Sequence, residues 1–150
     1  MAPPAPPPRA RRTEATRGIG LQFAVLYANR GWNVIGAARD LSKTEKLNAL
    51  SSPKFLQIDS SDEASITRAA KELEGESIDL LINNAGVLSP SGLETSTKAD
   101  LVRQFEVNAI SPFLVTRAFT SKMKAAVAAR GAASVAQISS YFGSVEFVST

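Results

Sequence analysis

The sequence contains no cysteine and no histidine. The missing cysteines exclude disulfides, thiolate nucleophiles and cysteine-bound zinc, and the missing histidines exclude Ser-His or Cys-His catalysis and imidazole-bound metals. A general acid or base must therefore be Asp, Glu, Lys or Tyr. No apolar run approaches the roughly 20 residues of a membrane-spanning helix. With 150 residues, 44% of them hydrophobic, the chain is typical of one soluble domain. We expect a cytoplasmic location and no membrane partner.

The first twelve residues differ from all that follow. Residues 1–12 (MAPPAPPPRARR) hold five of the eight prolines, together with Arg9, Arg11 and Arg12. Proline fixes φ and lacks an N–H, so we expect a disordered Pro/Arg-rich leader; a proline-recognition ligand and a targeting segment are the alternatives. These three arginines account for the net charge of +3, because the other residues balance at 14 basic and 14 acidic. The charge therefore marks a tail, and we expect no nucleic-acid partner.

From residue 13 onward, helical patterns alternate with short apolar runs. The spacing predicts helices over 19–30, 41–50, 60–75 and 99–127, and strands over 32–38, 54–58, 78–82 and 134–138. Ser60 with Glu63 predicts a capping box for the third helix, and Pro112 predicts a kink in the fourth. This alternation indicates an α/β domain over residues 13–150, with a parallel sheet covered on both faces.

Each predicted strand is followed by a polar cluster. These clusters are Arg39, Asp59, the run Asn83-Asn84-Ala85-Gly86 and the pair Ser139-Ser140. Parallel sheets of this kind bind ligands at the carboxyl ends of their strands, so the clusters predict one site at that edge. The NNAG run alone fits either a close approach to a nucleoside or a turn that ends a strand.

Residues 13–20 read TEATRGIG. Gly18 and Gly20 permit a turn and a close ligand approach at a helix N-terminus, although an ordinary helix start has the same pattern. Arg39 lies 19 residues after Gly20, where dinucleotide folds carry an acid for the ribose of NAD or an Arg for the 2′-phosphate of NADP. Together with Arg17 it favours NADP over NAD; the alternative is two solvated surface arginines.

Together these residues resemble the short-chain dehydrogenase/reductase family. That family has T-G-x-x-x-G-x-G, N-N-A-G, a helical asparagine, and a serine before Y-x-x-x-K. The matching segments here are TEATRGIG at 13–20, NNAG at 83–86, EVNA with Asn108, and ISSYFG at 138–143. Within the family the sequence is most similar to the small single-domain carbonyl reductases of the C-factor type. The resemblance implies a Rossmann-like doubly wound sheet and an NADP-dependent oxidoreductase that transfers a hydride between nicotinamide and a small carbonyl or alcohol substrate.

The resemblance also implies residue roles, none of them in a metal site. The implied cofactor-binding residues are Thr13, Arg17, Gly18, Ile19, Gly20, Arg39, Asp59, Asn83, Ala85 and Gly86. Of these, 18–20 would line the pyrophosphate, Asp59 would contact the adenine, and the NNAG residues would border the adenosine half. Asn108 would hold a water in the proton relay, and Ser140, or Ser139 one position earlier, would hydrogen-bond the substrate carbonyl. Read singly, Asn108 also fits an amide that satisfies backbone groups at a kink, and the serines fit a strand-end cap.

Three positions depart from the family pattern. Glu14 replaces the first glycine, and a carboxylate about 4 Å from a phosphate costs about 4 kcal/mol at an effective dielectric constant near 20. The place of the buried first strand holds PPRARR; burying unpaired arginines costs several kcal/mol each, so we expect a gap or a badly formed strand there. No tyrosine is followed by lysine four residues later, because Gly31 follows Tyr27 and Val145 follows Tyr141 at that spacing.

These departures predict an incomplete Rossmann-like sheet, with a degenerate first strand and the last strands missing, in a chain truncated at both ends. We expect this chain to be catalytically inactive. The alternative is a binding or assembly partner of a full-length paralogue, since family members often pair through the helix that carries Asn108; the same 99–127 helix would serve a homo-oligomer. A structureless translation product is the third hypothesis.

Overall fold

The computed structural model describes residues 9–12 (backbone only), 18–44, 54–89 and 92–140. The elements in chain order are β1 (Arg9–Arg12), α1 (Gly18–Asn29), β2 (Asn33–Ala38), the 3-10 turn η1 (Leu41–Lys43), β3 (Lys54–Gln57), α3 (Glu63–Glu72), β4 (Leu80–Asn83), α4 (Lys98–Phe105), the π-helical turn η2 (Glu106–Ile110), α5 (Ser111–Arg130) and β5 (Ser134–Gln137). The elements match the predicted ones except that the helix expected over 41–50 is seen only as η1, and its remainder falls outside the described residues.

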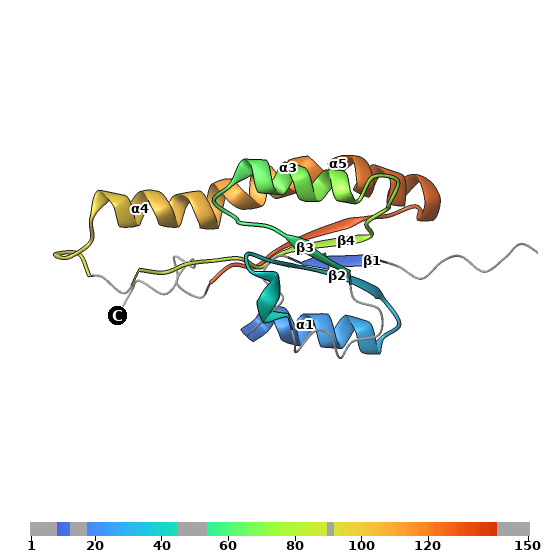
Figure 1. Cartoon of the computed structure of the whole chain (residues 1–150), viewed down its shortest axis with the longest axis horizontal. Coiled ribbons are helices and arrows are strands. Elements are labelled where there is room, and N and C mark those ends of the chain that lie inside the picture. The colour runs from blue at the N-terminus through green and yellow to red at the C-terminus, as the bar shows by residue number, and fades with distance from the viewer. Residues whose placement is uncertain (1–8, 13–17, 45–53, 90–91, 141–150) are drawn as a thin grey trace, which may run out of the picture.

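The strands form one parallel sheet in the order β3-β2-β1-β4-β5. Helix α1 covers one face, and α3 with α5 covers the other (Figure 1). The chain moves outward from β1 to β3, then returns to the other side of β1 to place β4 and β5. The strand order therefore reverses between β1 and β4, which is the topological switch point of a doubly wound sheet. The predicted Rossmann-like α/β class is confirmed.

Strand β1 lies in the middle of this sheet. Arg9–Arg12 pairs with Asn33–Gly36 of β2, and Ala10–Arg12 pairs with Leu80–Ile82 of β4. Of the two outcomes expected here, a gap or a badly formed strand, the gap is wrong, because a short strand of four residues fills the place. The disordered leader expected over 1–12 therefore does not include Arg9–Arg12; residues 1–8 lie outside the described part of the chain. Strand pairing uses backbone N–H and C=O groups, which arginine carries like any other non-proline residue, so the RARR sequence does not prevent it.

Most of the core lies between the sheet and the layer of α3 and α5. Its fully buried large side chains are Leu56, Ile66, Leu73, Ile78, Leu81, Val115 and Phe119. The opposite face has a smaller cluster, in which Ala24 of α1 meets Val34 of β2. Tyr27 packs against this cluster and meets Trp32 edge to face, with ring centroids 5.1 Å apart. The single tryptophan therefore reports on the α1 side of the sheet.

The N-cap of helix α3 lies two residues later than predicted. Asp62, not Ser60, is its N-cap, and its carboxylate accepts from the N–H of Ala64 at 2.9 Å. The predicted Ser60–Glu63 capping box is therefore wrong. The preceding turn is closed instead by Asp59, whose backbone carbonyl accepts from the N–H of Asp62 at 3.1 Å.

Where a kink was predicted in the last helix, the structure has a π-helical turn that interrupts the α-helical hydrogen-bond pattern. Helices α4 and α5 run end to end through η2, where the N–H of Ser111 bonds Glu106 instead of the residue four positions back. Pro112 follows in the first turn of α5. Proline has no N–H to donate to the residue four positions earlier, which here is Asn108, so the α-helical ladder is interrupted where Asn108 lies.

The far end of α5 is fixed to the start of β4 by one arginine. The guanidinium of Arg130 donates to both carboxylate oxygens of Asp79, with Nη2 2.9 Å from Oδ2, and to Ser77 Oγ at 2.7 Å. The two charged side chains are only 19% and 10% exposed. Gly131 ends the helix with a left-handed φ of 86°. Across the described ranges, no helix is long and apolar enough to cross a membrane.

Candidate functional site

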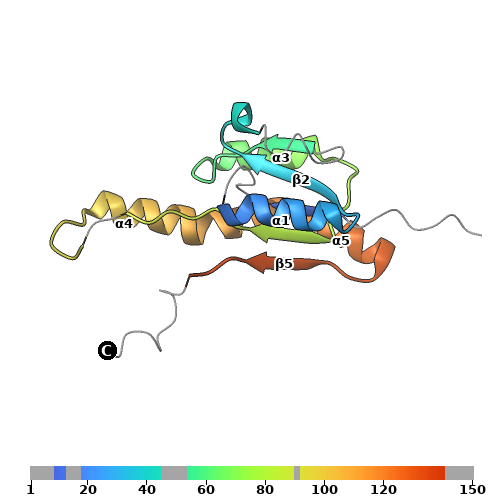
Figure 2. The ribbon, with the colours of Figure 1, turned by 90° about the horizontal axis from the view of Figure 1, so that it is seen from below.

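The predicted site residues that the structure describes fall into two groups on either side of the switch point. Arg39 and Asp59 follow β2 and β3, whereas the NNAG run and the serine pair follow β4 and β5. The dark blue start of α1 lies at the end of the molecule where these strands end (Figure 1). Figure 2 shows β5 at one edge of the sheet. Both groups thus lie at the carboxyl edge of one sheet, as predicted.

The group after β4 and β5 surrounds a cleft of about 830 Å³. The predicted residues in its wall are Asn83, Ala85, Gly86, Asn108, Ser139 and Ser140. Around them lie apolar neighbours, including Leu88, Phe113 and Ile138. The cleft is mainly apolar with a few converging amide and hydroxyl groups, which is the usual composition of a small-molecule site.

Asn83 fastens the floor of the cleft to α5. Its side chain is buried, and Nδ2 donates to Thr116 Oγ1 at 3.2 Å and to the carbonyl of Pro112 at 3.4 Å. Within the described part of the chain, Asn83 Oδ1 is buried without a hydrogen-bond partner. The side chain of Asn83 therefore connects the end of β4 to the helix just after η2.

Asn108 makes the return connection from η2 to the loop after β4. Its Nδ2 donates to the carbonyl of Val87, and its Oδ1 accepts from the N–H of Val87, both at 2.8 Å. The amide thus satisfies backbone groups, as the alternative interpretation expected, but they belong to the loop after β4 and not to the helix itself. Its backbone carbonyl, however, has no α-helical donor at Pro112. A carbonyl at that position is suited to bind a water molecule at the cleft wall.

The serine pair follows β5 directly. The sheet pairing extends to Ile138, whose N–H donates to the carbonyl of Asn83 at 2.9 Å. Ser139 and Ser140 come next, both exposed and both in the cleft wall. Because both serines line the cleft, either hydroxyl could serve as the predicted hydrogen-bond donor to a substrate. Tyr141 lies outside the described residues.

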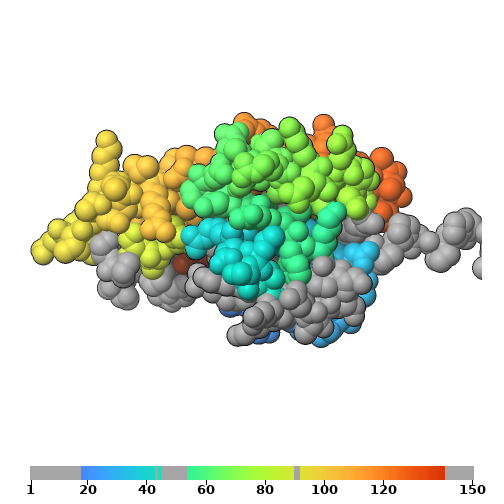
Figure 3. All heavy atoms as spheres, in the orientation of Figure 1, coloured from blue at the N-terminus to red at the C-terminus, as the bar shows by residue number. Residues whose placement is uncertain are grey.

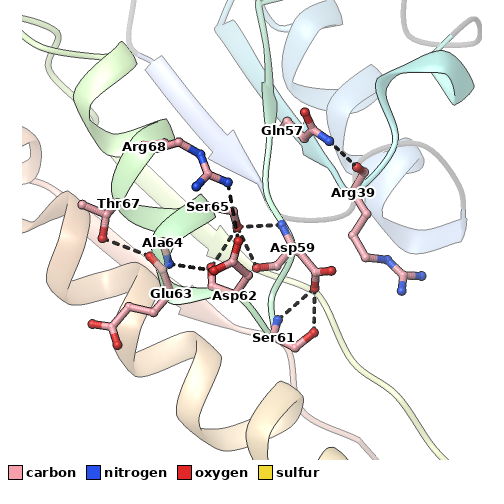
Figure 4. A network of polar contacts seen from close by, with 10 residues as sticks. All are labelled: Arg39, Gln57, Asp59, Ser61, Asp62, Glu63, Ala64, Ser65, Thr67 and Arg68. Carbon is pink, nitrogen blue, oxygen red and sulfur yellow. Dashed lines mark hydrogen bonds and ion pairs between the residues drawn. The ribbon is translucent and has the colours of Figure 1, made fainter.

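On the other side of the switch point, Asp59 and Arg39 lie close together (Figure 4). Asp59 Oδ1 accepts from the N–H of Ser61 at 3.0 Å and from its hydroxyl at 2.7 Å. These bonds, and then the nearby charge of Arg39, lower the pKa of Asp59 below its ordinary value against the opposing effect of burial. The Asp59 carboxylate is therefore ionised at neutral pH. Gln57 holds the Arg39 backbone, with Nε2 3.1 Å from the Arg39 carbonyl.

The glycine turn is described from Gly18 onward. Gly18 has a φ of 54°, a conformation that L side chains rarely adopt, and it begins α1 with nothing within 4 Å of its Cβ position. Ile19 is exposed and Gly20 is buried. The predicted residues Thr13 and Arg17 lie outside the described residues, as does Glu14, which departs from the family pattern.

Sequence reasoning missed the residues that hold this site in place. Ser61 had a signal, because Asp-x-Ser predicts a turn in which the carboxylate accepts from the residue two positions on. Thr116 and Val87 had none, since each meets its partner asparagine across 33 or 21 positions. In the described ranges, no cluster of three or more Asp and Glu side chains could hold a metal ion.

A doubly wound parallel sheet with a ligand-sized cleft beside its switch point defines a Rossmann-like domain. Comparison with known proteins is more specific: the family model described as short chain dehydrogenase matches residues 12–150. The chain belongs to the short-chain dehydrogenase/reductase family, whose members are oxidoreductases that bind NAD(P).

Individual relatives agree. The chain is 32% identical over 115 residues to galactitol 2-dehydrogenase of Agrobacterium fabrum, covering 74% of this chain and 45% of that protein. It is 36% identical over 129 residues to human retinol dehydrogenase 13, covering 79% and 38%. Its structure matches the NADPH-bound carbonyl reductase from chicken fatty liver with a TM-score of 0.84 at 28% identity, covering 95% of this chain and 64% of that one. The chain thus spans less than half the length of these two curated relatives.

Proposed function

We propose that this chain is the NADP-binding portion of an oxidoreductase that interconverts a small carbonyl compound and its alcohol. The main support is the single cleft that gathers the NNAG run, Asn108 and the serine pair at the carboxyl edge of the sheet. Arg39 and Asp59, across the switch point, match the adenosine end in chemistry. The similarity to an NADPH-bound carbonyl reductase supports the same cofactor and reaction type.

The described residues fit a nicotinamide dinucleotide. At the adenosine end, Asp59 Oδ2 takes part in no hydrogen bond within the described ranges, so it can accept from an adenine amino group. The guanidinium of Arg39, near the Asp59 carboxylate, can pair with a ribose 2′-phosphate. At the helix start, Gly18 leaves open space where a side chain would be. Arg39 and Asp59 would hold the adenosine half, and the NNAG backbone would border the dinucleotide at the cleft.

When bound, the cofactor supplies or accepts the hydride at the substrate carbon. The chain's own residues would orient the substrate and hold the proton path. The hydroxyl of Ser140, or of Ser139, would donate a hydrogen bond to the substrate oxygen. Asn108 would hold a relay water through its backbone carbonyl, because its side chain is already engaged with Val87. The family's tyrosine and lysine, which deliver the proton, have no counterpart at the required spacing in this sequence.

Cofactor choice tests the Arg39 assignment. We expect Arg39→Ala to weaken NADPH binding about thirtyfold, because a charge-assisted bond to phosphate contributes about 2 kcal/mol. NADH lacks the 2′-phosphate, so its affinity should change little. Calorimetric titration of both cofactors measures the ratio. Arg68→Ala, at an exposed arginine paired with Asp62, is the matched control. Equal losses for NADPH and NADH would contradict the assignment.

We expect the 150-residue chain to oxidise no NADPH in the presence of simple aldehydes. The reason is the missing Tyr-x-x-x-Lys pair, without which the developing alkoxide has no proton donor. The measurement is NADPH absorbance over an aldehyde panel, with the Ser139→Ala/Ser140→Ala double variant as the background. A rate above that background would show that this chain is catalytically competent.

The exposed face of α4 supports a second role, as a binding or assembly partner. Helix α4 buries none of its residues and projects from one end of the molecule (Figure 3). An apolar stripe continues from α4 into η2 and lines a shallow groove that also includes Glu106. The members of the stripe are 40–64% exposed: Leu101, Val102, Phe105 and Ile110. Such a stripe is typical of an interface. We propose that a second copy of the chain, or a full-length paralogue, covers it.

Association through this stripe predicts a concentration-dependent dimer. We expect Phe105→Glu to shift the chain to monomer, because it places a charge in the middle of the apolar contact. Sedimentation equilibrium measures the change in mass. Leu93→Glu removes an apolar residue that is 99% exposed but does not line the groove, and should leave the mass unchanged. A wild-type chain that stays monomeric at high concentration, alone and with a paralogue, would exclude this role.

A further inference from the structure

A buried hydroxyl, that of Ser65, is hydrogen-bonded to the backbone of Asp59. Ser65 is 3% exposed, and its Oγ accepts from the backbone N–H of Asp59 at 3.0 Å. The same Oγ lies 3.0 Å from the carbonyl of Asp59 and 2.8 Å from that of Asp62, and its single hydrogen can donate to either. One side chain thus binds both ends of the turn that runs from β3 into α3 (Figure 4).

Helix α3 does not need this hydroxyl as a cap. Its N-cap bond is already made by Asp62, which accepts from the N–H of Ala64. Residues of the same helix that face the core are apolar, such as Ile66 and Ala69. A serine buried among them is unfavourable, because its hydroxyl loses its hydration, unless hydrogen bonds within the protein replace that hydration. The bonds that do so are made to the turn that carries Asp59.

This β3–α3 turn sets the direction of the Asp59 carboxylate. With its backbone N–H held by Ser65 and its Oδ1 held by Ser61, Asp59 has little freedom of rotation. The oxygen left to accept a ligand, Oδ2, is thereby fixed beside Arg39. Asp59 and Arg39 would therefore recognise an adenine amino group and a ribose phosphate that lie at a fixed distance from each other.

We propose that Ser65 is a positioning residue for cofactor recognition: its buried hydroxyl holds the Asp59–Asp62 turn so that Asp59 presents one carboxylate oxygen to the 6-amino group of adenine. This inference rests on the NADP-binding function proposed above. Ser65 does not touch the ligand and acts only through Asp59.

The test uses two ligands that differ only in that amino group. These are adenosine 2′,5′-bisphosphate and the corresponding purine riboside bisphosphate, both of which lack the pyrophosphate that Glu14 would repel. We expect Ser65→Ala to weaken binding of the adenosine ligand about tenfold, the value of one hydrogen bond to a charged group, and to change the purine ligand less than about twofold. Thr67→Ala is the matched control, since that exposed hydroxyl bonds only its own helix at Glu63. A general loss of structure would weaken both ligands equally, and that result, or no weakening, overturns the proposal.

A second readout needs no ligand. Carboxyl-carbon NMR follows the pKa of Asp59, which the Ser61 hydrogen bonds lower first. In Ser65→Ala we expect this pKa to rise toward its ordinary value of 3.8, because the released turn loosens those bonds, and in Thr67→Ala we expect it to stay low. If the wild-type chain binds neither bisphosphate, the proposed function fails at this end, while the NMR result still decides the role of Ser65: an unchanged pKa overturns it. If Ser65→Ala does not fold, Ser65→Cys, which keeps the shape with a much weaker hydrogen-bonding group, replaces it in both measurements.

Discussion

Replacing Glu14 with glycine should tighten NADPH binding by about a thousandfold. In the family pattern this position is the first glycine of the turn around the pyrophosphate. A carboxylate about 4 Å from a phosphate at an effective dielectric constant near 20 costs about 4 kcal/mol, and each 1.4 kcal/mol is a factor of ten in affinity. This exceeds the gain from any single phosphate hydrogen bond. Glu14 is therefore expected to limit the affinity of the natural chain.

The expected gain has two separable parts. Glu14→Gln removes the charge but keeps a side chain, so it should recover the electrostatic part alone, and that part should shrink as salt screens the wild-type repulsion. Titration of the three proteins with NADPH at low and high ionic strength measures both parts. Glu94→Gln, in the exposed loop before α4, controls for a general change in net charge. Equal affinity of the wild-type chain and the Glu14→Gly variant would mean that this turn does not engage the pyrophosphate.

The periodicity of the sequence was sufficient to predict the fold class because the decisive signals are local. Apolar runs of four to six residues between helical segments predict a parallel sheet wherever both faces are covered. The prediction failed at β1, where side-chain chemistry argued against a strand. Arg9–Arg12 forms a strand because β2 and β4 lie on either side of it and supply backbone hydrogen-bond partners. No local pattern carries that information.

The candidate site was predictable only in part, for a similar reason. Residues that follow strands could be placed at one edge by topology alone, and the structure brings Asn83, Asn108 and the serines into one cleft. The supporting contacts depend on distances between segments. Asn83 reaches Thr116 across the β4–α5 packing, and Ser65 reaches Asp59 only because Asp62 is the N-cap of α3. Such contacts require the three-dimensional register of helix against strand.

The cleft depends on the placement of α5, so the stability of its far end bears on function. Arg130→Ala should lower the free energy of unfolding by about 3 kcal/mol. The substitution leaves the Asp79 carboxylate, whose side chain is only 10% exposed, without its charged partner. The matched control is Arg117→Ala, which breaks an ion pair with Glu63 whose side chains are 57% and 60% exposed. That change should cost at most about 1 kcal/mol.

Urea unfolding followed by the fluorescence of Trp32 and by circular dichroism measures both variants. Trp32 packs beside α1, on the sheet face opposite Arg130, so coincident transitions would show that the helix end and the far face unfold together. The difference between the two arginines is the informative quantity, because it compares a largely buried pair with an exposed pair on the same helix. If Arg130→Ala costs no more than Arg117→Ala, the contact with Asp79 does not anchor α5, and other contacts of this helix, such as the Asn83–Thr116 hydrogen bond and the buried Phe119, must hold the cleft wall in place.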